Sequence, residues 1–238
     1  MPSRTGAVPT LHSKVQSLCI AAVVLQQVDQ VVKTDRRARR RAETERRLVD
    51  SASVLFVERG YAATTLADVA DHAAIAPRTL YLHFPTKAEL LLRCIGVAIA
   101  GDAEPMALAE RPAMAEAMAA ATFDERLRLV ASLTASLMER TGPLLGVAFQ
   151  AAPSEPSIAA AAAAGRADTR RTLREFWHRI HDDGLLPPSI DLEWLTETAT
   201  LVVHAETNLL IGRTTGWDSD TYRDWLVTTW HRIAASST

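Results

Sequence analysis

The sequence predicts an all-α protein of about nine helices, because apolar residues recur at helical spacing along most of the chain and no segment alternates as a β-strand does. The clearest pattern lies at residues 46–92, where three short helices and two turns follow a run of arginines. Beyond residue 92, periodic segments are separated by breaks rich in glycine and proline. The 238 residues are enough for a small N-terminal domain and a larger helical domain behind it.

The first two of these helices are bounded by recognisable end residues. The first has a single apolar face formed by Leu48, Ala52, Leu55 and Phe56. Gly60 follows its last turn, where a left-handed residue commonly ends a helix. Thr65 lies three residues before Asp68, and this pair is typical of a helix start because both side chains can bond free backbone N–H groups. The second helix is therefore expected to begin after Thr65.

A third helix is predicted at residues 77–83, since proline suits the first turn of a helix. Only Leu80 and Phe84 are spaced to reach the core. The remaining side chains are free to contact a partner, as the second helix of a helix-turn-helix does when it contacts base edges in the major groove. These side chains are Pro77, Arg78, Thr79, Tyr81, Leu82 and His83.

Within residues 46–92, one set of positions follows a known signature in order and without gaps: Phe56, Gly60-Tyr61, Thr64-Thr65, Val69-Ala70, Thr79-Leu80-Tyr81, His83-Phe84 and Lys87. In these positions the chain resembles the TetR family of transcriptional regulators. Two positions depart from the family pattern, because Ala74 stands in a turn where glycine is usual and Ala76 stands where a capping serine is usual. A Cβ in a left-handed turn and a missing N-cap each cost roughly 1 kcal/mol, so both departures affect the pose of the third helix.

The resemblance implies a homodimeric regulator with a helix-turn-helix DNA-binding domain at residues 36–92 and an effector-binding and dimerisation domain at residues 93–238. The expected function is repression, in which a dimer binds a palindromic operator and a small, apolar or aromatic effector releases it. An effector-independent or activating regulator is the alternative within this class. An enzyme with a helical body and a protein-interaction scaffold are the alternatives outside it. In the family, contacts that position the protein on DNA come from residues matching Thr65, Tyr81, His83 and Lys87.

Arginines crowd the chain just before the first of the three helices. They are Arg36, Arg37, Arg39, Arg40, Arg41, Arg46 and Arg47. The net charge of −2 excludes a protein that binds polyanions through its overall charge, so a DNA contact needs a local patch such as this one. The run could follow the phosphate backbone or enter a minor groove, with Arg46 among the contacts, or it could be a solvated leader. The sequence supports both interpretations.

Residues 1–35 form an N-terminal extension that is expected to be disordered or not to belong to the protein made in the cell. Apolar residues recur there at helical spacing, but the run from Leu18 to Leu25 is too short to span a bilayer. One interpretation is an extra helix that packs on the body, and the other is that translation starts near Val31 or Val32. The protein is expected to be cytoplasmic and to have no membrane partner.

The second domain is predicted to be helical between a series of breaks. They fall at Gly101–Pro105, Arg111–Pro112, Gly142–Pro143, Pro153–Pro156, Gly184–Pro188 and Gly212–Asp218. Thr122 with Glu125 predicts the start of a helix that runs to about Arg140. A later helix, with Leu173, Trp177 and Ile180 on one face, should end at Gly184. The last two helices are expected at residues 191–211 and 219–235.

Those last two helices are apolar on more than one side, so other helices, from the same chain or from a second copy, must cover both faces. In the resembled family this pair meets its copy across a two-fold axis as a four-helix bundle. The alternative is that both faces belong to the core of one chain. The expected dimer contacts are Trp194, Thr198, Val202, Ala205, Tyr222, Leu226, Thr229 and Trp230.

The sequence indicates no enzyme, cofactor or metal site, because it has no phosphate-binding loop, no nucleophile elbow and no zinc pattern around His178 and His181. Cys19 and Cys94 are not expected to form a disulfide, and Cys94 is expected to be a small buried apolar residue. The resemblance implies a ligand cavity between helices of the second domain, lined by apolar residues with a few polar ones. The candidate lining residues are Met106, Met114, Met118, Phe149, Trp177, His178, His204 and Asn208.

Overall fold

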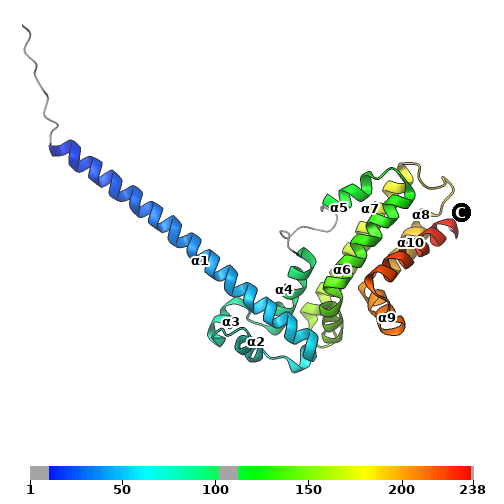
Figure 1. Cartoon of the computed structure of the whole chain (residues 1–238), viewed down its shortest axis with the longest axis horizontal. Coiled ribbons are helices and arrows are strands. Elements are labelled where there is room, and N and C mark those ends of the chain that lie inside the picture. Colours follow the sequence, from blue (N-terminus) through cyan, green and yellow to red (C-terminus); the bar gives the residue numbers. More distant parts are fainter. Residues whose placement is uncertain (1–10, 102–111, 237–238) are drawn as a thin grey trace, which may run out of the picture. The chain divides into compact units, whose positions relative to one another are not determined.

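The structure is a computed structural model that describes residues 11–101 and 112–236, with side chains from residue 37 onward. The helices are α1 (Leu11–Ala63), α2 (Leu66–His72), α3 (Pro77–His83), α4 (Lys87–Ala100), α5 (Pro112–Ala119), α6 (Phe123–Ala151), α7 (Pro156–Asp182), α8 (Leu192–Leu201), α9 (Ala205–Thr215) and α10 (Ser219–Ser236) (Figure 1). The predicted all-α class is confirmed for the described residues, which hold ten helices rather than about nine. None of these described helices is long and apolar enough to cross a membrane.

The chain forms two units, one up to Arg47 and one from Leu48 onward. The first unit is the α1 segment that carries the arginine run, and its side chains at residues 37–43 are all exposed. One turn apart on this segment, Arg46 Nη2 lies 2.9 Å from Glu43 Oε1. The predictions made for residues 1–35 fall outside the part of the chain whose side chains are described.

The second unit begins with a three-helix head, residues 48–83, made of the last part of α1 with α2 and α3. The predicted apolar face of the first helix is confirmed, because Leu48, Ala52, Leu55 and Phe56 are all buried. α1 breaks at Gly60, whose φ of 79° is left-handed. Thr65 Oγ1 accepts a hydrogen bond from the Asp68 backbone N–H, and the Thr65 backbone N–H donates to the Asp68 carboxylate, so the predicted capping box opens α2.

The turn between α2 and α3 carries the two departures from the family pattern. α3 spans Pro77–His83 as predicted, with Leu80 and Phe84 buried. Ala74 adopts a φ of 51°, which a residue with a Cβ adopts only at a cost. Ala76 is the N-cap of α3 and supplies no side-chain hydrogen bond. Both expected losses are therefore present in the turn that sets the position of α3.

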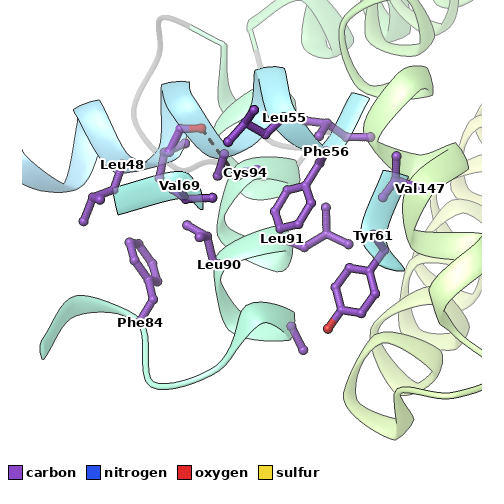
Figure 2. Close-up of a cluster of buried hydrophobic side chains, with 14 of the residues drawn as sticks. Leu48, Leu55, Phe56, Tyr61, Val69, Phe84, Leu90, Leu91, Cys94 and Val147 are labelled. Atoms are coloured by element: carbon purple, nitrogen blue, oxygen red, sulfur yellow. Dashed lines mark hydrogen bonds between the residues drawn. The ribbon is translucent and has the colours of Figure 1, made fainter. Parts of the chain in front are cut away.

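A hydrophobic core joins the head to helices that come much later in the chain. At its centre Phe56 stacks on Tyr61, with ring centroids 5.9 Å apart. Figure 2 shows these two rings beside Leu91 of α4 and Val147 of α6. Ile158 of α7 is fully buried in the same cluster. The head thus shares one core with α4 and with two helices of the body, which we define as residues 112–236.

α6 is longer than predicted. It is opened by the predicted capping box but runs over Phe123–Ala151, through Gly142 and Pro143, where a break was expected. Proline removes one hydrogen bond of a helix and would ordinarily kink or end it. Here Gly142 and Gly146 face α9, and the Leu209 side chain lies 3.7–3.9 Å from the position that a Cβ would take at either glycine. The prediction of a break was wrong because close packing against α9 stabilises the helix across that point.

The helix predicted at residues 191–211 is two helices. α8 ends at Leu201 and α9 begins at Ala205. Hydroxyl groups satisfy two carbonyls at the break, since Thr207 Oγ1 donates to Leu201 O at 2.7 Å and the Tyr222 hydroxyl donates to Val202 O at 3.1 Å. Buried carbonyls must be hydrogen-bonded somewhere, and these contacts allow the helix to stop without a glycine or proline.

A second core lies within the body. Phe176 and Trp177 of α7 contact Trp230 of α10, with ring centroids 6.5 and 6.1 Å from that of Trp230. The predicted inner face of α7 is confirmed, because Leu173 and Ile180 are buried in this core as well. The helix ends at Asp182, two residues before Gly184, as the sequence indicated.

Candidate nucleic-acid interface and ligand cavity

One face of α3 is turned away from the head core. Leu80 is fully buried, whereas Tyr81 and Leu82 are 53% and 73% exposed. Pro77 and Arg78 are exposed too, and Thr79 and His83 are half-buried. Two large, exposed apolar side chains beside an arginine form a surface of the kind that commonly binds a partner. Thr65, at the start of α2, is also exposed.

Arg78 is the cation on this face of α3. Among the described residues, no hydrogen bond or ion pair engages its guanidinium group. The planar guanidinium has donors that can bind two acceptors at once, as on a guanine edge. Arg46, the other arginine predicted to contact DNA, lies in the first unit and binds Glu43.

Lys87, predicted to contact phosphate, is bound within the chain. Its Nζ donates to the Tyr61 carbonyl at 2.7 Å and lies 4.2 Å from the centroid of the Tyr61 ring. These contacts hold the ammonium group at the first residue of α4, beside the last part of α1. An ammonium group has three donors, so the bond to Tyr61 leaves two for a phosphate.

The Tyr61 side chain continues this set of contacts into the body. Its hydroxyl donates to Glu155 Oε1 at 2.9 Å, and Glu155 is the N-cap residue of α7. Burial and the bond to Glu155 raise the pKa of Tyr61, so the hydroxyl keeps its proton and remains a donor. Sequence reasoning missed Glu155, whose position before Pro156 indicates a helix start but not a partner 94 residues away.

A cavity of about 360 Å³ lies between α4, α6, α7 and the start of α9. Its apolar wall includes Ile95 and Ile99 of α4, Leu145 of α6 and Ile158 of α7. Because α4 leads directly from the head, a molecule in this cavity would touch the helix that connects the two regions.

The cavity contains two of the predicted lining residues, Phe149 and His204. Met114, Met118 and Trp177 lie in the second core or against it, and His178 is exposed on α7. The Asn208 side chain lies near Gly142, and Met106 falls outside the described residues.

The polar side of the cavity includes paired charges, three threonines and one histidine. Arg166 Nη1 lies 2.8 Å from Glu206 Oε1, and Arg171 Nη1 lies 2.8 Å from Asp168 Oδ1. Burial lowers the pKa of His204, while the charge of Glu206 opposes this shift and that of Arg166 adds to it. This shift favours the neutral form of the imidazole. Arg166 and Glu206 are 40 positions apart, and no local pattern marks them as partners.

The residues predicted for the dimer interface fall into two groups. Tyr222, Leu226 and Trp230 are buried inside one chain, and Trp230 Nε1 donates to Ala199 O at 3.2 Å, so these three side chains are not available to a partner. Trp194 is exposed, and the half-buried members are Thr198, Val202, Ala205 and Thr229. The prediction overlooked Leu201 and Leu210, which are 62% and 61% exposed on α8 and α9.

Cys94 is buried in the first core, as expected, with its Sγ 3.6 Å from Val49 O. Burial raises the pKa of the Cys94 thiol to about 11, which leaves little reactive thiolate at neutral pH. Within the described residues, no cluster of three or more His, Cys, Asp and Glu side chains could hold a metal ion.

Comparisons of sequence identify the head. The model of the family "Bacterial regulatory proteins, tetR family" matches residues 48–94. The HTH-type transcriptional regulator TtgR of Pseudomonas putida is 43% identical over 49 residues, which are 21% of this chain and 23% of that protein. The HTH-type transcriptional repressor KstR2 of Rhodococcus jostii is 48% identical over 44 residues, or 18% of this chain and 22% of that protein. The chain thus matches less than a quarter of the length of either relative.

Comparisons of structure extend over most of the chain. A TetR transcription regulator from Haloarcula marismortui has a TM-score of 0.61 at 14% identity, covering 82% of this chain and 98% of that one. The transcriptional regulator FadR from Bacillus subtilis, solved in complex with stearoyl-CoA, has a TM-score of 0.60 at 17% identity, covering 77% and 96%. Residues 48–94 therefore match the TetR family of regulatory proteins, and the described helices have the fold of solved proteins that carry this family name.

Proposed function

We propose that the protein is a transcriptional repressor that binds a palindromic DNA operator as a homodimer and leaves it when a small effector binds. The observation that carries this proposal is the exposed face of α3, where Arg78, Tyr81 and Leu82 lie around the buried Leu80. In a helix-turn-helix, this helix enters the major groove. The match of residues 48–94 to a family of regulatory proteins favours this function over an enzyme.

Arg78 and Lys87 have different roles in the proposal. Arg78 reads sequence, because it is the exposed side chain of α3 that can make a bidentate pair with guanine. Lys87 positions the protein, because it lies at the N-terminus of α4, where backbone N–H groups and an ammonium can both meet a phosphate. Thr65, Tyr81 and His83 support the same backbone contacts, while Pro77, Thr79 and Leu82 approach the bases.

A mobility-shift titration on operator and random DNA separates these roles. Arg78→Ala should weaken operator binding by about 1–3 kcal/mol and leave random DNA nearly unaffected. Lys87→Ala should weaken both and lower the salt slope by about one unit. Arg213→Ala, at an exposed arginine on α9, is the control and should change neither. If Arg78→Ala selects the same consensus as the wild type, Arg78 does not read sequence.

The homodimer is supported by exposed apolar side chains on the last helices of the body. Trp194 and Leu201 of α8 and Leu210 of α9 are each more than 40% exposed. Apolar residues exposed in a group commonly mark a contact with another chain. A two-fold dimer would also match the proposed palindromic operator, since each half-site would bind one α3.

Sedimentation at micromolar concentration tests the dimer. Leu201→Asp and Leu210→Asp should both give monomers, because an unpaired charge at a buried contact costs several kcal/mol. Val54→Asp is the matched control, since Val54 is an exposed apolar residue on α1 at 44% exposure. Dimers that persist in both body variants would place the interface elsewhere.

The effector role rests on α4, which lies in both the cavity and the head core. Ile95 lines the cavity and is packed in the same core as Leu90 and Leu91. A ligand can shift DNA binding only if it prefers one of two arrangements of the head, and α4 supplies a contact through which it would do so.

The sign of regulation is tested by gene deletion. A dimer bound over a promoter blocks polymerase, so deletion should raise transcription from the operator's own promoter. The names of the relatives include both signs, a repressor in KstR2 and an activator in FasR of Mycolicibacterium smegmatis. A fall in transcription after deletion would make this protein an activator.

A further inference from the structure

We infer that the cavity takes an uncharged molecule that is mostly apolar and carries one hydrogen-bonding group, placed beside His204. This inference rests on the proposed function, because it names the chemical class of the effector. It follows from three properties of the lining: an apolar wall with one aromatic side chain, charges that are already paired, and a neutral imidazole without a partner.

The wall sets the apolar part of the ligand. Most of it is aliphatic, from residues such as Ile95, Leu145 and Ile158. Phe149 is the one Phe, Tyr or Trp among the described lining residues. Recognition of a quaternary ammonium group commonly uses several aromatic faces around the cation, and this wall does not provide them.

The charged residues of the lining disfavour an ionic ligand, because they are already paired with each other. Within the described lining they form two opposite pairs, Arg166 with Glu206 and Arg171 with Asp168, each at 2.8 Å. A carboxylate ligand would have to share Arg166 with Glu206, and the negative charge of that acid would oppose it. A cationic ligand would likewise compete with Arg166 for Glu206. Burying a charge without a new partner is unfavourable, so neither ion gains from entry.

His204 supplies the hydrogen-bonding position. It precedes α9, but its side chain makes no capping bond, and no other described residue hydrogen-bonds its imidazole. The hydroxyls of Thr141 and Thr169, which also line the cavity, donate to the carbonyls of Leu137 and Gly165 in their own helices. A neutral imidazole offers one donor and one acceptor, which suits an alcohol, a phenol or a ketone.

Three probes that each contain an eight-carbon chain test the class directly. Calorimetry on the full chain at pH 7 would compare 1-octanol, octanoate and octyltrimethylammonium. We expect 1-octanol to bind at least about tenfold more tightly than either ion. Equal or tighter binding of octanoate or of the ammonium compound would overturn the inference.

Four variants locate the binding. His204→Leu should weaken 1-octanol about fivefold, the effect of one hydrogen bond, and His204→Gln should restore much of the loss because it keeps a donor and an acceptor. Ala161→Phe should abolish binding by filling the cavity. His178→Leu, at an exposed histidine of α7, is the control and should bind as the wild type. If both His204→Leu and Ala161→Phe bind octanol with the affinity of the wild type, the ligand does not bind in this cavity.

DNA binding is measured on the same samples without any probe. Specific DNA binding combined with the absence of octanol binding would refute the ligand class and leave the proposed function intact. Absence of DNA binding would refute the proposed function, while the preference among the three probes would still report on the cavity.

Discussion

The head and the body end their helices by different means. In the head, three boundaries coincide with a residue whose own chemistry ends or starts a helix: Gly60 in a left-handed conformation, Thr65 with its capping box, and Pro77 at the first position of α3. In the body, α6 continues through Pro143, and α8 stops at Leu201 although neither glycine nor proline follows. These head boundaries therefore depend on neighbours in sequence, whereas these two points of the body depend on neighbours in space.

This difference predicts how substitutions propagate. A change at a head boundary should act locally on one helix. A change where helices of the two regions meet should act on both, because Phe56 of the head and Val147 of the body lie in one core. Three measurements test this difference between the two regions.

The largest effect is expected for Phe56→Ala. Phe56 is fully buried, and truncating a buried phenylalanine typically costs about 3–5 kcal/mol. All five tryptophans lie beyond residue 176, so tryptophan fluorescence reports unfolding of the body, whereas far-UV circular dichroism reports every helix. We expect urea to give coincident transitions by both signals, each shifted to lower urea. Val57→Ala, at an exposed head position, should shift neither, and a tryptophan transition that stays at its wild-type midpoint in Phe56→Ala would show that the head unfolds alone.

An intermediate effect is expected in the turn before α3. Ala74→Gly removes a Cβ from a residue at φ 51° and should raise the free energy of unfolding by up to about 1 kcal/mol. Ala76→Ser should add about as much by bonding a free N–H of α3. Ala67→Gly, at an exposed position inside α2, is the control and should lower stability by about 1 kcal/mol. Loss of stability in Ala74→Gly would mean that the strain is relieved in some other way.

The smallest effect is expected on the pH dependence of the melting temperature, and it concerns an ion pair of the body. Arg126 Nη2 lies 2.6 Å from Asp183 Oδ2, and this hydrogen bond, helped by the charge of Arg179, holds the pKa of Asp183 below its usual value of 3.8. A lowered carboxyl pKa stabilises the folded state above the unfolded-state value, and that contribution is lost as the pH falls through the folded-state value. Asp183→Asn should therefore lower the melting temperature at pH 7. Acidification to pH 3 should then lower the melting temperature of this variant by less than that of the wild type. Asp182→Asn, at the exposed neighbour, is the control for the loss of one negative charge, and a fall in its melting temperature at pH 7 as large as that of Asp183→Asn would show that the ion pair is not responsible.

Local chemistry explains which parts of the molecule could be predicted. Gly60, Thr65 and Pro77 act through their own backbone or through a residue a few positions away, so their effects could be read from the sequence. The bond between Tyr61 and Glu155 joins positions 94 apart, and nothing near either residue indicates it.

The candidate cavity shows the same limit. Phe149 and Trp177 are both aromatic residues on periodic apolar helices, and sequence alone treats them alike. Phe149 lines the cavity, whereas Trp177 is fully packed against Phe176 and Trp230. The way in which α6, α7 and α10 cross decides between these outcomes, and that crossing depends on residues spread over the whole body.

The shared core also bears on the engineering of hybrid regulators. A graft that joins the head of another regulator at residue 92 would keep Val147 and Ile158 from this protein but replace the surface of Phe56 and Leu91 on which they pack. The junction would then combine two surfaces that were not selected to fit each other. A graft that also transfers the inward-facing positions of α6 and α7 would keep the fit, and it would carry the new DNA preference without loosening the cavity beneath α4.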